Sequence, residues 1–299
     1  MLALLKGVSR SFYLSIRLLP GPLREPVALA YLLARASDTI ADAPGLSAHA
    51  RIDALDRFIR AVDGAGAPPT VAFSSGMSQH EQRLLKALPE CIESLRALSP
   101  EDREDIRTVL GQITHGQRLD VARFGDASST NPHSLANADE LDEYTYLVAG
   151  CVGEFWTKLG FRHLPSFATL PEEEMLDLGR RYGMALQLIN VLRDEKHDID
   201  TGRRYVPPGQ SREDLLHRAH EGLASGMRYA GALRSARVRV ATALPALIGA
   251  RTIALVREQG PGAKMPRSEV RGLLLRVALA CGSNAALQRE FKRWDNRPR

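Results

Sequence analysis

The chain has 299 residues, of which 44% are hydrophobic and 25% are charged, and its 24 glycines and 17 prolines are ordinary numbers for a globular protein. This composition excludes an intrinsically disordered chain and predicts a sizeable buried core. The formal net charge of +5 is small and does not gather into a basic patch, so we expect no nucleic-acid partner.

Helical periodicity dominates the chain, and no sustained alternation of polar and apolar residues is bounded by hairpin signals. We therefore predict an all-α protein, a helical bundle. Because no break in composition separates two parts, we expect a single domain over residues 1–299. The expected helices, in chain order, lie at residues 22–43, 48–62, 80–98, 100–122, 138–159, 172–198, 212–228, 230–258 and 267–292.

The first expected helix carries a polar stripe on an otherwise apolar surface. Tyr31, Arg35, Asp38 and Asp42 are spaced at i, i+4, i+7 and i+11, which places them on one face of an α-helix. The two aspartates are i,i+4 neighbours, and like charges so placed destabilise a helix by roughly a few tenths of a kcal/mol unless a cation lies between them. The arginine one turn before them offers a fork suited to phosphate oxygens.

A second stripe of the same kind lies on the helix expected at residues 172–198. Gln187, Asn190, Asp194 and Asp198 share one face of that helix, again among apolar residues. Carboxylate oxygens with a nearby amide suit a hard cation such as Mg²⁺ or Mn²⁺, which is often shared with a substrate phosphate. A solvated helix face would explain one such stripe by itself.

Two such stripes in one chain predict a metal site that both serve, with a diphosphate as its natural ligand. The expected metal ligands are Asp38, Asp42, Asn190, Asp194 and Asp198. After the second stripe, Gly202 is expected to end the helix and to leave Arg203 and Tyr205 near its metal-binding end. Arg203 suits a phosphate, whereas Asp200 is assigned to solvent.

The chain resembles the squalene/phytoene synthase family, and four pieces carry the resemblance in the order in which the family has them. They are SRSFYLSIRLLP at residues 9–20, the first aspartate motif with its leading Arg35, YTYLVAGCVGE at residues 144–154, and LQLINVLRDEKHD at residues 186–198 with the following GRRYVP. Together they span residues 9–207, and beyond them only the general helical pattern is similar.

The resemblance implies an all-α isoprenoid-synthase helical bundle around a central cavity, in an enzyme that joins two prenyl diphosphates head to head. It implies that Ser9 and Ser11, otherwise part of an ordinary polar segment, contact phosphate oxygens beside Phe12. It also implies that Tyr144, which by itself would be core or surface, handles a proton together with the released diphosphate. The residues then expected to bind substrate are Ser9, Ser11, Phe12, Tyr31, Arg35, Gln187, Asn190, Arg193, Arg203 and Tyr205, and those expected to act in catalysis are Tyr144, Asp38, Asp42, Asp194 and Asp198.

For the reaction, the resemblance implies a farnesyl-diphosphate farnesyltransferase like the squalene synthases of the family. Two farnesyl diphosphates would condense through presqualene diphosphate after Mg²⁺-assisted ionisation, and NADPH would supply the hydride that gives squalene. Other interpretations stay open: a phytoene synthase acting on two geranylgeranyl diphosphates, a dehydrosqualene, hydroxysqualene or presqualene diphosphate synthase without NADPH, a metal-dependent phosphohydrolase, or a non-catalytic assembly protein. The pattern locates neither the cavity floor that would separate C15 from C20 substrates nor an oligomer interface.

Cysteines and apolar stretches bear on where the protein works. Three cysteines without CxxC spacing predict neither a disulfide framework nor a thiol metal site, so we expect buried free thiols in a reducing compartment.

The opening MLALLK is too short for a signal-peptide core, and the apolar stretches 27–34 and 240–250 fall short of the roughly 18 residues that a membrane span needs. We therefore expect a cytoplasmic protein that contacts a membrane only at its surface. Phe291 and Trp294 in the basic tail FKRWDNRPR could rest there, but a frayed basic tail is the favoured explanation.

Overall fold

The computed structural model describes residues 2–8, 12–73, 76–280 and 283–293. Contacts divide the chain into two compact units, Met1–Arg17 with Gly21–Asp126 and Leu18–Pro20 with Ala127–Arg299. These are called the N-terminal and the C-terminal unit. The expected single domain over residues 1–299 stays a prediction, because the division does not show whether either unit folds alone.

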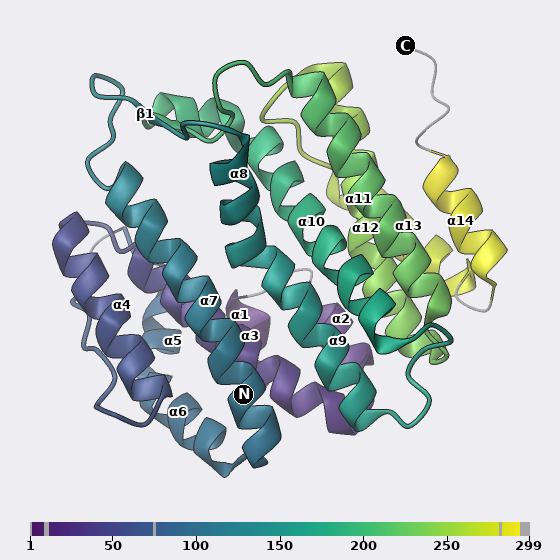
Figure 1. The fold of residues 1–299 in the computed structure, drawn as a ribbon, viewed down its shortest axis with the longest axis horizontal. Helices are drawn as coiled ribbons and strands as arrows, with labels where there is room; N and C mark the ends of the chain where they lie inside the picture. The colour runs from purple at the N-terminus through teal and green to yellow at the C-terminus, as the bar shows by residue number, and fades with distance from the viewer. Residues whose placement is uncertain (1, 9–11, 74–75, 281–282, 294–299) are drawn as a thin grey trace. The chain divides into compact units, whose positions relative to one another are not determined.

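The N-terminal unit is organised around the helix that carries the first stripe, α3 (Gly21–Ala41) (Figure 1). Its other helices are α1 (Leu2–Val8), α2 (Phe12–Leu18), α4 (Ala48–Val62), α5 (Gln79–Lys86), α6 (Leu88–Ala97) and α7 (Pro100–Phe124). α3 packs against α1, α4, α5, α6 and α7, and its apolar side chains such as Leu29, Leu32 and Leu33 are buried. The side chains of the stripe, in contrast, are half-buried or exposed.

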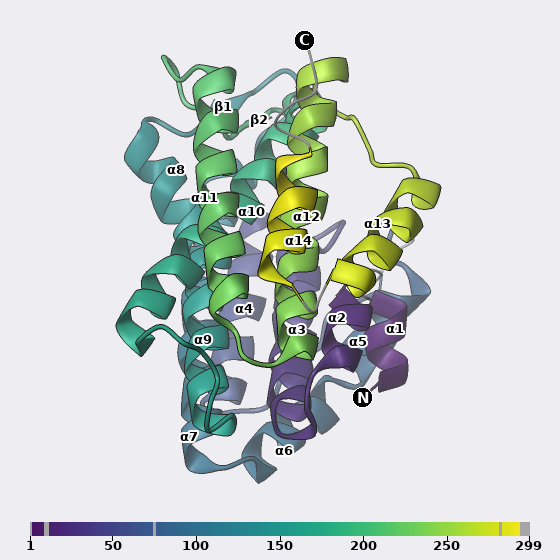
Figure 2. The same ribbon diagram turned by 90° about the vertical axis from the view of Figure 1, so that its right-hand side faces the viewer.

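The C-terminal unit is organised in the same way around α10 (Glu172–Asp200) (Figure 2). α10 packs against α8 (Ala138–Thr145), the π-helical turn η1 (Tyr146–Gly150), α9 (Cys151–His163), α11 (Arg212–Ala232) and α12 (Ala236–Gln259). The unit is completed by α13 (Arg267–Ala280), α14 (Asn284–Lys292) and two short parallel strands, β1 (His133–Ser134) and β2 (Arg203–Arg204). Leu188, Ile189 and Leu192 bury the apolar faces of α10.

Serine and asparagine caps start several of these helices. In each case the side-chain oxygen accepts a hydrogen bond from a backbone N–H of the first turn, which stabilises a helix by about 1 kcal/mol. The capping residues are Ser47, Ser78, Ser99, Asn137, Ser211 and Ser283. Ser78 and Glu81 form a complete capping box, in which the side chain of each accepts from the backbone of the other.

The expected all-α class agrees with these elements, but three expected helices are interrupted. The helix expected at 80–98 is two helices, α5 and α6, because Pro89 lies in the first turn of a new helix. The helix expected at 138–159 contains the π-helical turn, and the one expected at 267–292 is divided into α13 and α14. The helix expected at 48–62 has the predicted bounds. The short α1, α2 and strands were not predicted.

Glycines let the backbones of α9 and η1 approach the backbone of α10 closely. A Cβ on Gly153 would lie 2.0 Å from the carbonyl oxygen of Gly179, and a Cβ on Gly183 would lie 2.1 Å from the carbonyl oxygen of Ala149. No real Cβ atom stands so close to an oxygen, so a larger residue fits only if a backbone moves. This contact sets the distance between α10 and the segment that carries Tyr144.

Gly153→Ala should therefore destabilise the protein by about 1–3 kcal/mol, the usual cost of overpacking a core. Gly111→Ala in α7 is the matched control, because a Cβ there meets nothing within 4 Å and alanine has the higher helix propensity. Thermal unfolding should show a lower midpoint for Gly153→Ala and an unchanged or higher midpoint for Gly111→Ala. Equal midpoints would contradict the close approach of α9 and α10.

One helix of the described part of the chain, α12, is long and apolar enough to cross a membrane by length and composition. The apolar stretch 240–250, which by itself was expected to be too short for this, belongs to this helix of 24 residues. Of its most apolar window, 78% is buried inside the structure. α12 packs against α10, α11, α13 and α14, so most of its apolar surface is used in the core.

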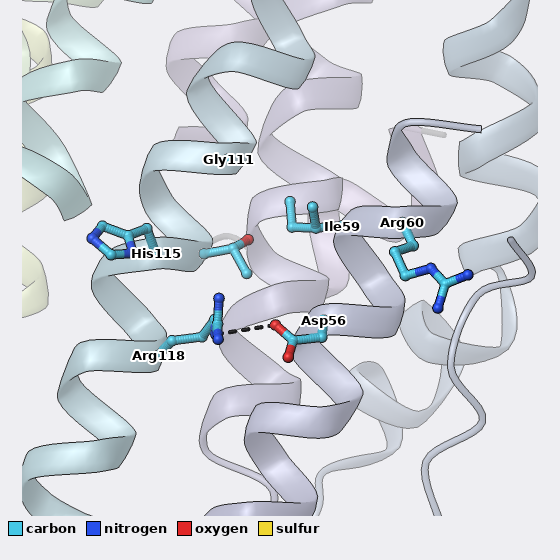
Figure 3. A pocket seen from close by; sticks show the side chains of 7 residues that line it. Asp56, Ile59, Arg60, Gly111, His115 and Arg118 are labelled. Atoms are coloured by element: carbon cyan, nitrogen blue, oxygen red, sulfur yellow. Dashed lines mark ion pairs between the residues drawn. The ribbon is translucent and has the colours of Figure 1, made fainter. Parts of the chain in front are cut away.

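A hollow of about 440 Å³ lies between α4 and α7 in the N-terminal unit (Figure 3). An ion pair crosses it, with Nε of Arg118 3.0 Å from Oδ1 of Asp56. The other lining residues are Ile59, Arg60, Gly111, Thr114 and His115. No residue predicted for the site lines this hollow.

Candidate active site

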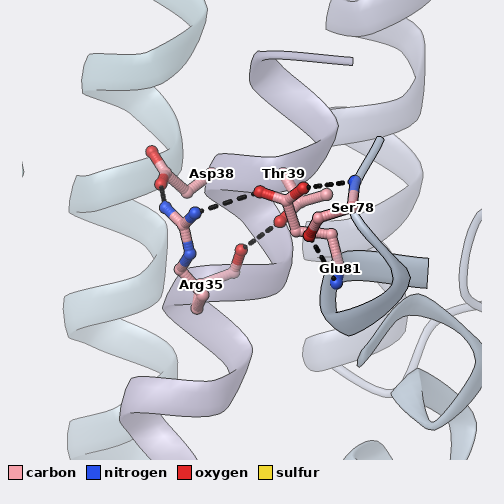
Figure 4. Close-up of polar contacts among 5 residues, drawn as sticks. All are labelled: Arg35, Asp38, Thr39, Ser78 and Glu81. Atoms are coloured by element: carbon pink, nitrogen blue, oxygen red, sulfur yellow. Dashed lines mark hydrogen bonds and ion pairs between the residues drawn. The ribbon is translucent and has the colours of Figure 1, made fainter. Parts of the chain in front are cut away.

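The stripe on α3 contains an arginine that two carboxylates hold (Figure 4). Nη1 of Arg35 pairs with Asp38 one turn later on the same helix, and Nη2 donates to Oε1 of Glu81 on α5 at 3.1 Å. The side chains of Arg35 and Asp38 are 33% and 43% exposed. Tyr31 is half-buried and Asp42 is exposed. The predicted stripe thus forms, and it gains a partner from α5.

The carboxyl group of Asp38 lies where a negative charge is unfavourable. Burial and then the charge of Asp42 raise the pKa of Asp38 to about 6, and together they outweigh the opposite effect of Arg35. A carboxylate in such surroundings is stabilised by a bound cation. In the described part of the chain the buried Nε of Arg35 has no hydrogen-bond partner, so a donor for an anionic oxygen lies at the same place.

The stripe on α10 is joined to the tyrosine segment by a chain of hydrogen bonds. The side-chain amide of Asn190 donates to Oε1 of Gln187, and the amide of Gln187 donates to the hydroxyl of Tyr144, both at 3.2 Å. The ring of Tyr144 lies against the ring of Tyr205, with their centroids 4.9 Å apart. The structure therefore brings four of the predicted residues together within the C-terminal unit.

The carboxylates near the end of α10 lie among arginines. Nε of Arg193 donates to Oδ1 of Asp194 at 2.9 Å, and Nη2 pairs with the other oxygen of the same carboxylate. Burial and then the charge of Asp194 raise the pKa of Asp198, although Arg203 acts in the opposite direction. Asp198 is thus a second carboxylate with an unfavourable charge, and Arg203 lies close enough to act on it, as predicted.

A short pair of strands fixes the segment that follows α10. His133 on β1 lies opposite Arg203 on β2, and the N–H of His133 donates to the carbonyl oxygen of Gly202 at 2.8 Å. Gly202 has a φ of 83°, and a Cβ there would lie 2.1 Å from the carbonyl oxygen of Ser128. The predicted turn at Gly202 is confirmed. The strands were missed because two residues carry no periodic signal.

Three of the predicted residues lie at the start of the chain. Ser9 and Ser11 fall outside the described residues, and Phe12 is the first residue of α2, with no side chain described. Their expected contacts with phosphate oxygens stay predictions. Asp200, which was assigned to solvent, is exposed.

The cysteine and tail expectations have different outcomes. Cys91 and Cys151 are buried free thiols, as expected, while Cys281 lies outside the described residues.

Phe291 is buried and its ring stacks on that of His220, with centroids 5.1 Å apart. The alternative in which Phe291 rests on a membrane is therefore wrong, because a side chain stacked inside the unit is not available to lipid, and Trp294 lies outside the described residues.

Glu81 was missed by the sequence analysis. The pattern of a serine followed three residues later by a glutamate is a readable capping signal, and the structure has that capping box. The contact between Glu81 and Arg35 joins residues 46 positions apart, and no local pattern indicates it.

The carboxylates of each stripe fit a divalent cation whose other ligands are water and phosphate oxygens. In the described ranges, no group of three or more His, Cys, Asp or Glu side chains is placed to hold a metal ion. Each stripe offers two carboxylates, and one of each pair, Asp38 or Asp198, has a raised pKa. Mg²⁺ usually keeps several waters and shares its coordination with substrate phosphates, so two carboxylates on each stripe suit it.

Residues 5–208 match the family model described as squalene/phytoene synthase. The chain belongs to the squalene/phytoene synthase family. The matched range contains both stripes, the Tyr144 segment and Arg203 with Tyr205, so the resemblance that the sequence motifs indicated is confirmed.

The curated proteins that are similar to this chain carry two kinds of name. A bifunctional lycopene cyclase/phytoene synthase of Phaeosphaeria nodorum is 32% identical over 206 residues, which cover 68% of this chain and 33% of that protein. A squalene synthase of Yarrowia lipolytica is 30% identical over 204 residues, which cover 68% of this chain and 44% of that protein. The match therefore spans less than half the length of either relative.

Solved structures of similar proteins show the fold. A complex of TcSQS with the ligand BPH1237 matches with a TM-score of 0.80 at 19% identity, covering 98% of this chain and 88% of that one. A dehydrosqualene synthase in complex with a ligand matches with a TM-score of 0.64 at 20% identity, covering 94% and 95%. The family member thus has the helical isoprenoid-synthase fold, which confirms the predicted fold class.

The raised pKa of Asp38 predicts a pH-dependent stability. This pKa is about 6 in the folded protein, above the ordinary value of 3.8, so between these values the folded state holds a proton that the unfolded state has released. The free energy of unfolding therefore falls as the pH rises through this window, and the loss is complete above about pH 6. Asp38→Asn removes the effect. Because the side chain is 43% exposed, we expect a gain of only about 1 kcal/mol at about pH 8 and none at about pH 4.

Urea unfolding in EDTA at the two pH values measures this difference. Asp200→Asn is the control, because Asp200 is an exposed aspartate outside both pairs, and it should leave the free energy of unfolding nearly unchanged at both. A gain for Asp38→Asn that is the same at both pH values would contradict the unfavourable charge at Asp38.

Proposed function

We propose that the protein is a prenyltransferase of isoprenoid biosynthesis that joins two farnesyl diphosphates head to head through presqualene diphosphate. Family membership supports the reaction class. The observation that carries the proposal is the pair of stripes, each with two aspartates of which one has a raised pKa, and each beside an arginine. Paired carboxylates in surroundings that disfavour their charge suit Mg²⁺ and a diphosphate better than they suit a structural role.

Mg²⁺, or Mn²⁺ on the same ligands, would be held on each stripe by its own aspartates, Asp38 with Asp42 and Asp194 with Asp198, and Asn190 would be a further donor on the second stripe. When bound, it would neutralise the leaving diphosphate and so favour ionisation of the allylic C–O bond. Arg35, Arg193 and Arg203 would bind diphosphate oxygens through their planar guanidinium groups, which match such oxygens in pairs.

Tyr144 is the proposed proton-handling residue. Its hydroxyl accepts a hydrogen bond from the amide of Gln187, and a hydroxyl group can both accept and donate a hydrogen bond. When the cyclopropane ring of presqualene diphosphate closes, this oxygen would take the proton that is lost from carbon while its own proton passes to the released diphosphate. The faces of the Tyr144 and Tyr205 rings would stabilise positive charge on the prenyl chain.

Phytoene synthesis from two geranylgeranyl diphosphates is the second candidate, and the phytoene synthase relatives support it. Squalene as the product would require a hydride from NADPH, to which we assign no residue. Dehydrosqualene, hydroxysqualene or presqualene diphosphate as the product would require none. All these reactions begin with the same ionisation of a prenyl diphosphate.

We propose a cytoplasmic location with contact to a membrane at the protein surface only. The burial of α12 inside the C-terminal unit supports this, because its apolar residues are used in the core. The substrates are amphiphilic, so a surface contact would give access to them and to an apolar product.

A product assay with purified protein, Mg²⁺ and labelled farnesyl diphosphate, with and without NADPH and repeated with the C20 substrate, tests the proposal. Squalene that forms only with NADPH would support it as stated. A C15-derived product that does not depend on NADPH would assign one of the non-reductive reactions, and turnover of the C20 substrate alone would make the protein a phytoene synthase. Turnover of neither would overturn the proposal.

Asp38→Asn and Asp194→Asn should each lower kcat/KM by at least about a thousandfold, because each removes a proposed metal ligand that acts on the leaving group. Asp200→Asn is the matched control on α10, since Asp200 is an exposed aspartate two residues beyond the second pair, and it should keep its activity. Circular dichroism would verify that all three variants are folded. Retained activity in both stripe variants would contradict the proposal.

A further inference from the structure

Glu81 on α5 contacts the first stripe although it lies outside every motif that predicted the site. Its Oε1 accepts a hydrogen bond from Nη2 of Arg35 at 3.1 Å, while Nη1 of the same guanidinium pairs with Asp38 (Figure 4). The arginine is therefore shared between a carboxylate on its own helix and one on another helix. The side chains of Arg35 and Glu81 are 33% and 26% exposed, so the contact is partly screened from water.

Glu81 is itself fixed by the start of α5. Its Oε2 accepts from the backbone N–H of Ser78 at 3.0 Å, and its own N–H donates to Oγ of Ser78 at 3.3 Å. Burial raises the pKa of Glu81, but the hydrogen bonds from Ser78 and the charge of Arg35 outweigh burial and keep the pKa below its ordinary value. Glu81 is thus an ionised carboxylate whose two oxygens have separate tasks, one toward the helix start and one toward Arg35.

The second carboxylate changes what Arg35 does to Asp38. With Asp38 as its one anionic partner, the guanidinium would close on that carboxylate and compete with a cation for it. With Glu81 in place, part of the arginine charge is compensated from α5, and one Nη group is held in a fixed direction. Asp38 can then bind a cation while the contact with Glu81 keeps the guanidinium of Arg35 in position. The remaining N–H donors of Arg35 stay available to an anion.

We propose that Glu81 is a positioning residue that holds the guanidinium of Arg35 ready for a diphosphate while Asp38 binds a divalent cation. This inference rests on the proposed function, because it takes a metal-bound diphosphate as the ligand of the stripe. Glu81 itself does not touch the substrate. It acts through Arg35 and links the start of α5 to the first aspartate pair.

Calorimetric titration with inorganic pyrophosphate in the presence of Mg²⁺ tests the proposal without turnover. Glu81→Gln keeps the capping box, in which glutamine can replace glutamate, but removes the charge that faces Arg35. We expect pyrophosphate to bind about 5- to 20-fold more weakly, as for the loss of a partly exposed hydrogen bond between charged groups. In steady-state assays KM for the prenyl diphosphate should rise by a similar factor, with kcat within about twofold.

Two further variants separate positioning from helix capping. Ser78→Ala removes the serine side of the cap but leaves the contact between Glu81 and Arg35, so it should lower the unfolding midpoint by about 2–4 °C and leave the affinity for pyrophosphate unchanged. In an Arg35→Gln background, Glu81→Gln should have no further effect on this affinity, because Glu81 acts through the arginine.

An affinity in Glu81→Gln equal to that of the wild type, or an equal loss in the presence and absence of Arg35, would overturn this inference and leave the proposed function standing. A wild-type protein that neither binds pyrophosphate with Mg²⁺ nor turns over a prenyl diphosphate would overturn the proposed function and this inference with it.

Discussion

Repulsion between paired carboxylates is the constraint on which the rest of this structure depends. Asp42 raises the pKa of Asp38 on α3, and Asp194 raises that of Asp198 on α10, in each case added to the effect of burial. A helix that carries such a pair needs other contacts to keep it folded, because like charges one turn apart oppose helix formation. Both helices obtain these contacts from the other helices of their own units, because each unit packs around one of them. The protein therefore stabilises the two helices through their apolar faces, and on each polar face one carboxylate stays in surroundings that disfavour its charge, as is common at functional sites.

The three arginines near the carboxylates are placed by different means. Arg193 pairs with its chain neighbour Asp194, so the helix alone brings them together. Arg203 depends on the turn at Gly202 and on the strand pair with residues 133–134. Arg35 depends on a carboxylate from α5. The positive groups of the two stripes thus depend on local, loop and tertiary structure, each within its own unit, and a change far from the motifs can alter them.

The same division explains what the sequence could predict. Both stripes, the helix at 48–62 and the turn at Gly202 follow from periodicity and residue type within one element, and they were predicted. The contact between Arg35 and Glu81 and the β1–β2 pair join distant parts of the chain, for which one sequence has no local signal. The break between α5 and α6 had a signal, Pro89, but the apolar periodicity continues across it and favoured one long helix. The likeness to a family supplied a role for Tyr144 that its own position does not indicate.

The π-helical turn η1 has a consequence for the length of the segment around it. Tyr144 and Gly153 are nine positions apart, and at about 100° per residue an unbroken α-helix would place them on opposite sides. The π turn takes up one extra residue and so rotates one half of the helix against the other, which lets Tyr144 reach Gln187 and Gly153 pack on Gly179 of the same helix. An unbroken α-helix over the same residues would turn the tyrosine away from Gln187. The segment is therefore one residue longer than a regular helix that presents the same two faces, and the hydrogen-bond register of this turn is a functional property in the same sense as the identity of its residues.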